Sequence, residues 1–182
     1  LSILDAKIDC DAIALIGDSA ALYGHHENQI VMVDIADPAA PRILGTCTLP
    51  VAFNGGEMEA SGEFVYATTK SGLAIVRISD PSNPSLIKII EFGAVAHDVI
   101  LRDRYAFVAA GEGGVRVLDI SDPFAPNEAG YFEASTDFLP VAIAVERAAR
   151  AKEGAAADLD ADYVLYAANL AGPAAILGFR AP

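Results

Sequence analysis

The chain has 182 residues and a mass of 18.9 kDa, enough for one domain with its own hydrophobic core. Hydrophobic residues make up 53% and charged residues 20%, which excludes a disordered chain. With 25 acidic against 12 basic residues, the net charge of −13 disfavours binding to nucleic acid or to an anionic membrane. No apolar run reaches the roughly 18 residues that a membrane-spanning helix needs. The chain begins with Leu1 rather than Met, so the lack of a signal-peptide pattern means little.

The two cysteines, Cys10 and Cys47, form neither a CxxC pair nor a zinc-binding spacing. This excludes a covalent c-type haem and a cysteine-rich zinc site built from this chain alone. Counting cysteines leaves open whether the two residues pair in one disulfide.

Short apolar runs bounded by turn residues divide the chain into successive groups of predicted strands. The first group begins near Leu4 and has its second strand at 13–16, a lengthened loop at 17–29 between the second and third strands, and further strands at 30–33 and 42–46. The second group has strands at 56–60, 64–68, 73–76 and 85–89. The third group has strands at 97–101, 105–109, 115–118 and 127–131.

An Asp-Pro segment precedes the last strand of each group, at 34–41, 77–84 and 119–126. The three segments align without gaps, and their first prolines lie 43 and 42 residues apart. A period of this length is typical of one four-stranded propeller blade.

The chemistry of these segments predicts tight turns. Proline fixes φ at the second turn position, and the preceding Asp accepts hydrogen bonds from backbone amides across the turn. We therefore interpret Asp37, Asp80 and Asp122 as turn-capping residues. The second proline of each segment cannot donate to a strand ladder, so it marks the start of the outermost strand.

A fourth group is interrupted by an insertion. Residues 163–178 align without gaps on residues 105–120 but follow them by 58 residues, which is more than one period. The excess is the Ala-rich, charged stretch at 147–162, which separates predicted strands at 141–145 and 163–167. No Asp-Pro turn and no fourth strand follow, so this group is incomplete.

These groups resemble the LVIVD (LVIVP) repeat. They share an aromatic-Ala-aromatic-Val strand, a Gly-Leu or Gly-Val pair and a Val-Asp-Ile-Ser-Asp-Pro-x-x-Pro segment, best matched at 72–84 and 96–126. The fourth copy departs from the pattern, because Leu177, Gly178 and Phe179 replace the Asp-Ile-Ser core. The resemblance implies a β-propeller, and a place among bacterial and archaeal proteins, many of them exported or surface-attached. The family defines no catalytic residues, so none is carried over.

We therefore expect an all-β fold of propeller blades with four antiparallel strands each, about four blades in this chain, the last one incomplete. The approximate blade bounds are 1–50, 51–93, 94–135 and 136–182. We expect the chain to be part of a larger propeller, completed by a missing upstream segment, a partner chain or a second copy. A longer parent chain is the simplest of these, because an uncovered blade exposes an apolar face and an unpaired strand edge.

A candidate metal site lies in the predicted loop at 17–29. His25, His26 and Glu27, joined by His97 at the start of an inner strand, offer imidazole and carboxylate ligands for a divalent metal. We favour a solvated loop or a contact with a neighbouring protein, because adjacent histidines do not readily chelate from one extended loop. We expect no cofactor, with a divalent metal as the alternative.

Three acidic residues, Glu57, Glu59 and Asp98, are predicted on inner strands and are candidates to line the central channel. Paired carboxylates there could hold Ca²⁺ or act as acid and base, but we favour a water-filled surface. The turn Asp residues lack the spacing of a calcium loop. The glycine-rich segment at 111–114 joins two strands instead of opening a helix, unlike a phosphate-binding loop. The sequence holds no GxSxG or HExxH motif.

These observations favour a non-catalytic binding or scaffold module, not an enzyme, that is secreted, periplasmic or at the cell surface and presents loops for protein–protein interaction. One alternative is a metal-dependent enzyme or ligand-binding protein with a site at the channel mouth near His25, His26, Glu57 and His97. Another is a structural subunit of a surface assembly completed by another chain. We expect no nucleic-acid partner and no membrane span in this chain.

Overall fold

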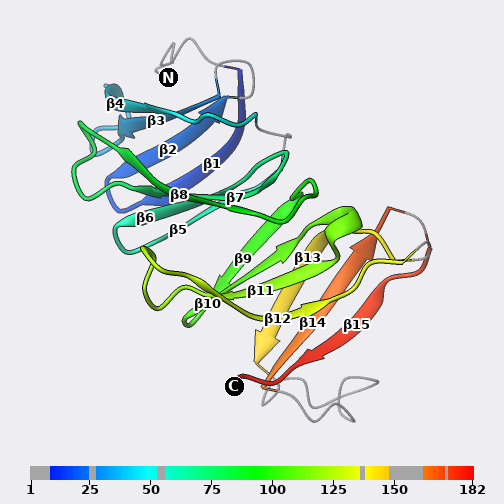
Figure 1. Ribbon diagram of the computed structural model, residues 1–182. Helices are drawn as coiled ribbons and strands as arrows, with labels where there is room; N and C mark the ends of the chain where they lie inside the picture. The colour runs from blue at the N-terminus through cyan, green and yellow to red at the C-terminus, as the bar shows by residue number, and fades with distance from the viewer. Residues whose placement is uncertain (1–8, 25–27, 53–55, 136–137, 148–161, 171) are drawn as a thin grey trace.

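The computed structural model describes residues 9–24, 28–52, 56–135, 138–147, 162–170 and 172–182. These residues form four antiparallel sheets that follow one another along the chain (Figure 1). They contain no α-helix and a single 3₁₀ turn, Gly111–Gly113. No helix in the described part of the chain is long and apolar enough to cross a membrane.

Each of the first three sheets has four strands in chain order, and the fourth has three. The first sheet contains β1 (Cys10–Ile16), β2 (Ser19–Gly24), β3 (Gln29–Asp34) and β4 (Arg42–Thr48). The second contains β5 (Met58–Ser61), β6 (Phe64–Thr68), β7 (Gly72–Arg77) and β8 (Ser85–Glu91). The third contains β9 (Asp98–Arg102), β10 (Tyr105–Ala109), β11 (Val115–Asp119) and β12 (Asn127–Phe132). The fourth contains β13 (Pro140–Arg147), β14 (Tyr163–Asn169) and β15 (Ala175–Phe179).

This arrangement confirms the predicted all-β fold of four propeller blades with an incomplete last blade. The outermost strands β4, β8 and β12 begin directly after the second proline of each Asp-Pro segment, as predicted. Residues 148–161, which make up nearly all of the predicted insertion, lie outside the described residues.

A two-residue turn joins the first two strands of each complete sheet. Its first residue is Gly17, Gly62 or Asp103, with φ of 56°, 58° and 54° respectively. Glycine adopts this left-handed conformation without a steric penalty, and Asp tolerates it better than most residues do. Because the same turn recurs, the three sheets can be compared residue by residue, counting from the end of the first strand.

The prediction of a long loop at 17–29 is wrong. Residues Ser19–Gly24 form β2, so the segment that was expected to be the second strand is the first one, β1. The Ser-Ala-Ala start of β2 lacks the aromatic and β-branched residues that mark β6 and β10. Burial of Ala21 and Tyr23 against the second sheet nevertheless holds it as a strand.

The gap-free alignment of the fourth group is wrong by one residue. Tyr105 pairs with Asp119 in the third sheet, and the pair with the same separation in the fourth sheet is Val164–Gly178. Each strand residue of the third sheet therefore corresponds to a residue one place further along the fourth group than the alignment predicts, and its side chain lies on the other face of the sheet. The alignment had matched Gly172 to Gly114, which hid this shift in the sequence.

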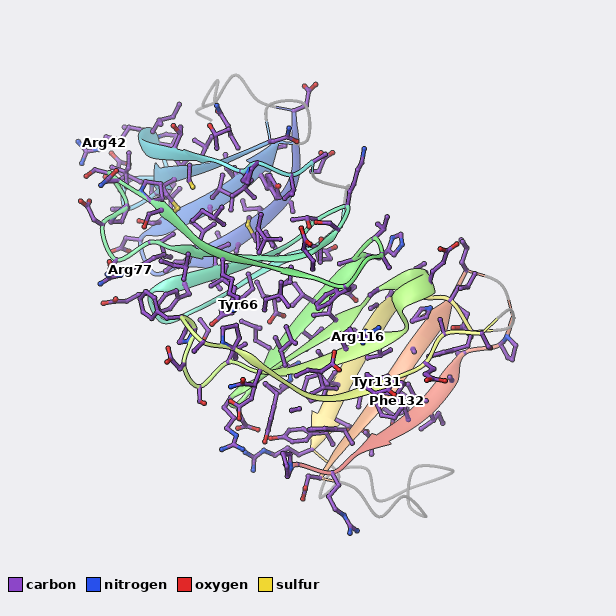
Figure 2. All side chains as sticks on the ribbon, viewed as in Figure 1. Arg42, Tyr66, Arg77, Arg116, Tyr131 and Phe132 are labelled. Carbon is purple, nitrogen blue, oxygen red and sulfur yellow. The ribbon has the colours of Figure 1, made fainter. Side chains whose placement is uncertain are left out.

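Successive sheets pack face to face in a row, because alternate residues of each strand point to opposite faces. Figure 2 shows Tyr66 where the second and third sheets meet. Aromatic rings fill the space between the third and fourth sheets, where Tyr105 and Phe107 lie 5.4–5.8 Å from the rings of Tyr163 and Phe179. The innermost strands β1, β5, β9 and β13 follow one another along the row.

Candidate functional site

The loops between the second and third strands lie at one end of the sheets, beside the segments that link one sheet to the next. Backbone hydrogen bonds tie the two kinds of segment together. The His97 amide donates to the Ala109 carbonyl at 2.8 Å, and the Leu170 amide donates to the Leu139 carbonyl at 3.0 Å. We call this end of the molecule the loop face. Backbone hydrogen bonds therefore fix the positions of its segments.

The tight loop of the second sheet shows how firmly the loop face is built. The buried Thr69 Oγ1 donates to the Gly72 carbonyl at 3.0 Å and accepts from the Gly72 amide at 3.0 Å. The Ala96 amide donates to the Thr69 carbonyl at 3.0 Å and so joins this loop to the third sheet. Hydrogen bonds of this kind leave a buried loop few conformations.

A cleft of about 290 Å³ opens on the loop face between the third and fourth sheets. Its walls are mostly apolar, and it is lined by Val95, His97, Gly111, Glu112, Leu139, Val141 and Leu170. Leu170 is 73% exposed at the edge of the cleft. A cleft of this size is at the lower end of the range for small-molecule pockets and suits one or two side chains of a partner.

His97 brings an imidazole to this cleft. Burial lowers the pKa of His97, which favours the neutral form of the ring. Gly111 adopts a φ of 49°, and a Cβ atom there would lie 3.2 Å from His97 Nε2. Glycine at this position therefore leaves room for the ring.

The other residues of the predicted metal site, His25, His26 and Glu27, lie outside the described residues. In the part of the chain that the structure describes, no three His, Cys, Asp or Glu side chains come together as a group that could hold a metal ion.

The inner-strand acids reach the next sheet. Glu59 Oε2 accepts a hydrogen bond from the Leu101 amide at 2.6 Å, and Asp98 Oδ2 accepts one from the Ile143 amide at 2.8 Å. Glu57 is exposed just before β5. Burial raises the pKa of both Glu59 and Asp98. These two carboxylates therefore connect neighbouring inner strands.

The turn Asp residues accept hydrogen bonds from the second amide beyond them. Asp37, Asp80 and Asp122 each use Oδ1, over 2.9, 3.0 and 3.0 Å respectively. Asp34 and Asp119 make the same kind of bond three residues earlier, which the sequence analysis missed. These carboxylates are thus engaged in local turns.

A second hollow, of about 310 Å³, lies at the opposite end of the same pair of sheets and is lined in part by Arg102, Val145 and Glu146. Asp103 accepts hydrogen bonds there from Arg147 Nε at 3.0 Å and from the Tyr163 hydroxyl at 2.8 Å. The hydrogen bond from Arg147 is the main reason that the pKa of Asp103 is lowered. This ionic contact ties the turn of the third sheet to the fourth.

Cys10 and Cys47 are free. They lie on β1 and β4, the two edge strands of the first sheet, with two strands between them. Three strand spacings amount to about 14 Å, and a disulfide needs Cα atoms within about 7 Å of each other. The open alternative of a Cys10–Cys47 disulfide is therefore excluded in this fold.

Sequence reasoning missed most of the cleft. Leu139, Val141 and Leu170 were not singled out, because they come from separate segments that meet only in the folded chain. The available signal was Leu170, an apolar residue in a loop where the second sheet has polar residues and glycine.

The model of the LVIVD repeat family matches residues 22–48, 56–91 and 93–134, more than half of the chain. The chain therefore belongs to the LVIVD repeat family. A search of the curated proteins found no match.

The chain is also similar to solved propeller-like structures. The computationally designed Ika4 protein has a TM-score of 0.70 and 10% identity, over 98% of this chain and 96% of that one. Sqt1 from Saccharomyces cerevisiae has a TM-score of 0.72 and 11% identity, over 95% of this chain and 46% of that one. BamB from Moraxella catarrhalis has a TM-score of 0.65 and 15% identity, over 96% and 48%. At these identities the likeness shows the fold alone.

The chain thus spans nearly all of Ika4 but about half of Sqt1 and BamB. A propeller built from LVIVD repeats supports a binding or scaffold module in general terms.

Proposed function

We propose that the chain is a non-catalytic binding or scaffold module that acts outside the cytoplasm and presents its loop face to a protein partner. The observation that carries this proposal is the apolar cleft between the third and fourth sheets. Interfaces between proteins are centred on apolar side chains seated in such hollows, with polar groups around them. Val141 and Leu170 supply the apolar contact, and Glu112 supplies a charge at the rim.

The hydrogen bonds of the inner-strand acids support a binding role over an acid–base one. Glu59 and Asp98 each have an oxygen engaged by a backbone amide of the next sheet. A carboxylate held in this way stiffens the scaffold by joining two inner strands, and it has only its second oxygen left to meet a substrate. A place outside the cytoplasm is in keeping with the LVIVD repeat, which occurs in many exported and surface-attached proteins.

The experiment is affinity capture from extracts of the producing cells with three forms of the purified chain. The cleft variant is Leu170→Asp, and the control is Phe124→Asp, which adds the same charge at a 55% exposed site in an Asp-Pro turn. We expect the wild type and the control to retain the same specific protein and the cleft variant to lose it. Equal capture by all three forms would contradict the proposal.

Metal content separates this function from the metal-dependent alternative. We expect no stoichiometric metal in the purified chain and no change in unfolding midpoint on adding a chelator. A bound metal that stabilises the chain would support the alternative instead. Fractionation of the producing cells tests the location, and recovery in the cytoplasmic fraction would contradict it.

A further inference from the structure

The two ends of the row of sheets expose apolar faces at positions that are buried elsewhere in the row. Counting back from the two-residue turn, Ile13, Met58 and Val99 occupy the same place on the innermost strand. Met58 is 4% and Val99 2% exposed, because each packs on the preceding sheet, whereas Ile13 is 57% exposed. Leu15 on the same face is 69% exposed. The first sheet therefore presents a packing face that no sheet of the described residues covers.

The fourth sheet shows the same contrast on its other face. In each sheet, one cross-strand pair between the second and third strands points toward the following sheet. The pairs are Ala21–Met32, Tyr66–Ile75, Phe107–Val117 and Tyr166–Ile176. Members of the first three pairs are at most 2% exposed, but Tyr166 is 37% and Ile176 42% exposed. The fourth sheet thus carries the apolar pair that elsewhere packs on the next sheet.

Within one copy these two faces cannot cover each other. Figure 1 places the first and fourth sheets at opposite ends of the row. Apolar faces of this kind on a protein surface mark sites of association. In the contacts within the row, an inner-strand face packs on a cross-strand pair of the preceding sheet. A cover for the fourth sheet would therefore present a face like that of Ile13 and Leu15, and a cover for the first sheet would present a pair like Tyr166–Ile176.

We propose that two copies of this chain close one ring, with the Tyr166–Ile176 face of each copy packed on the Ile13–Leu15 face of the other. A second copy supplies both missing neighbours at once, through the contact type that already joins consecutive sheets. The 182 residues match about half of the Sqt1 and BamB chains and nearly all of the Ika4 chain, so two copies together would match the length of the two longer chains. This proposal goes beyond the proposed function and does not involve the cleft.

Charge affects how tightly the copies associate. Each copy carries a net charge of −13, so two copies repel each other at low ionic strength. Salt screens this repulsion and leaves the apolar contact in place. Association is therefore expected to strengthen as salt is raised.

The test is the mass of the 182-residue chain by size exclusion with light scattering over a concentration series. We expect the wild type to reach twice the 18.9 kDa of one chain. Leu15→Lys and Ile176→Glu each place a charge in both contacts of the ring, so each variant alone is expected to run as one chain. Far-UV circular dichroism checks that the variants keep the strand signal.

Mixing the two variants tests how the faces pair. A mixed ring contains one Leu15→Lys chain and one Ile176→Glu chain. One of its two contacts then has only wild-type residues, and in the other the new lysine faces the new glutamate. The mixture is therefore expected to recover the mass of two chains. If the contact instead joined two first sheets, Ile176→Glu alone would still dimerise.

Three results would overturn the proposal. The first is a wild-type mass of one chain at every concentration and salt level. The second is that Leu15→Lys and Ile176→Glu each still have the mass of two chains. The third is that a mixture of the two variants keeps the mass of one chain. Where a charged variant loses its strand signal, Leu15→Ser and Ile176→Ser replace it. The unfolding midpoint is an independent readout, because it rises with protein concentration only for an associating chain.

Discussion

The carboxylate of Asp98 accepts a hydrogen bond from the backbone amide of Ile143 over 2.8 Å, and so joins the innermost strands of the third and fourth sheets. Glu59 makes the corresponding link from the second sheet to Leu101 of the third. Both acids were predicted to line the central channel, and each accepts a hydrogen bond from a backbone amide on the inner strand of the next sheet. Such an amide would otherwise stay without a protein partner.

Replacing Asp98 by Ala is expected to lower the free energy of unfolding by about 1 kcal/mol, because the half-buried link to the Ile143 amide loses its acceptor. Asp98→Asn keeps an acceptor oxygen and is expected to lose less. Urea unfolding of both variants measures the difference. The control is Glu57→Ala on the exposed neighbouring acid, which is expected to change stability little. An equal loss in Asp98→Ala and the control would argue against the link.

The same acid gives a pH prediction. Burial raises the pKa of Asp98 in the folded chain above the usual carboxyl value. The folded state therefore binds more protons than the unfolded state between those two pKa values, and stability falls as pH rises through that interval. Asp98→Asn removes this contribution. As pH rises through the interval, the unfolding free energy of the variant is therefore expected to fall less, or to rise more, than that of the wild type.

Urea unfolding at a series of pH values tests this, with Glu57→Gln as a control that also removes one carboxylate. The lowered pKa of Asp34, due first to the bond from the Ala36 amide, acts in the opposite direction in all three proteins. That contribution is lost as pH falls, and it cancels when the variants are compared with the wild type. A pH slope in Asp98→Asn equal to that of the wild type would count against a raised pKa.

Gly45 on β4 marks a close approach between the first two sheets. A Cβ atom there would lie 2.4 Å from the backbone oxygen of Ser82, in the Asp-Pro turn of the second sheet. Gly45→Ala is therefore expected to cost about 1–3 kcal/mol of stability, because the backbone must move apart. Thermal unfolding measures the loss, with Thr46→Ala at the next, exposed position as the control. A variant as stable as the control would show that the sheets have room there.

The cysteines predict a labelling pattern. Cys10 is exposed and Cys47 is buried, and burial is the main cause that raises the pKa of the Cys47 thiol. In the native chain a thiol reagent is expected to label Cys10 quickly and Cys47 only slowly. In denaturant both thiols are expected to react. Failure of either to react in denaturant without reductant would indicate a disulfide and contradict the sheet order.

The strands of the second and third sheets could be predicted because strong local signals agree there. Residues 64–68 and 105–109 were predicted with the bounds of β6 and β10, since aromatic and β-branched residues lie between clear turns. β2 was missed because its Ala-rich start has no sequence pattern typical of a strand. Its strand conformation depends on packing against the second sheet. The one-residue shift of β14 and β15 was missed because Gly172 had been matched to Gly114.

The candidate site was harder to predict for a geometric reason. The repeat predicts that Glu59 and Asp98 lie on inner strands. Their carboxylates, however, accept hydrogen bonds from the neighbouring sheet, and the distance between two sheets cannot be predicted from the sequence of either strand. The cleft needs His97, Leu139 and Leu170 to meet from three segments. No local sequence pattern predicts that these three segments lie side by side.

Small-angle X-ray scattering of the wild-type chain over a concentration series tests most directly whether the two end faces of the row are packing surfaces. The predicted result at high concentration is a ring-shaped particle with twice the 18.9 kDa mass of one chain. A particle with the mass of one chain at every concentration, and a profile that fits the single row of Figure 1, would contradict it.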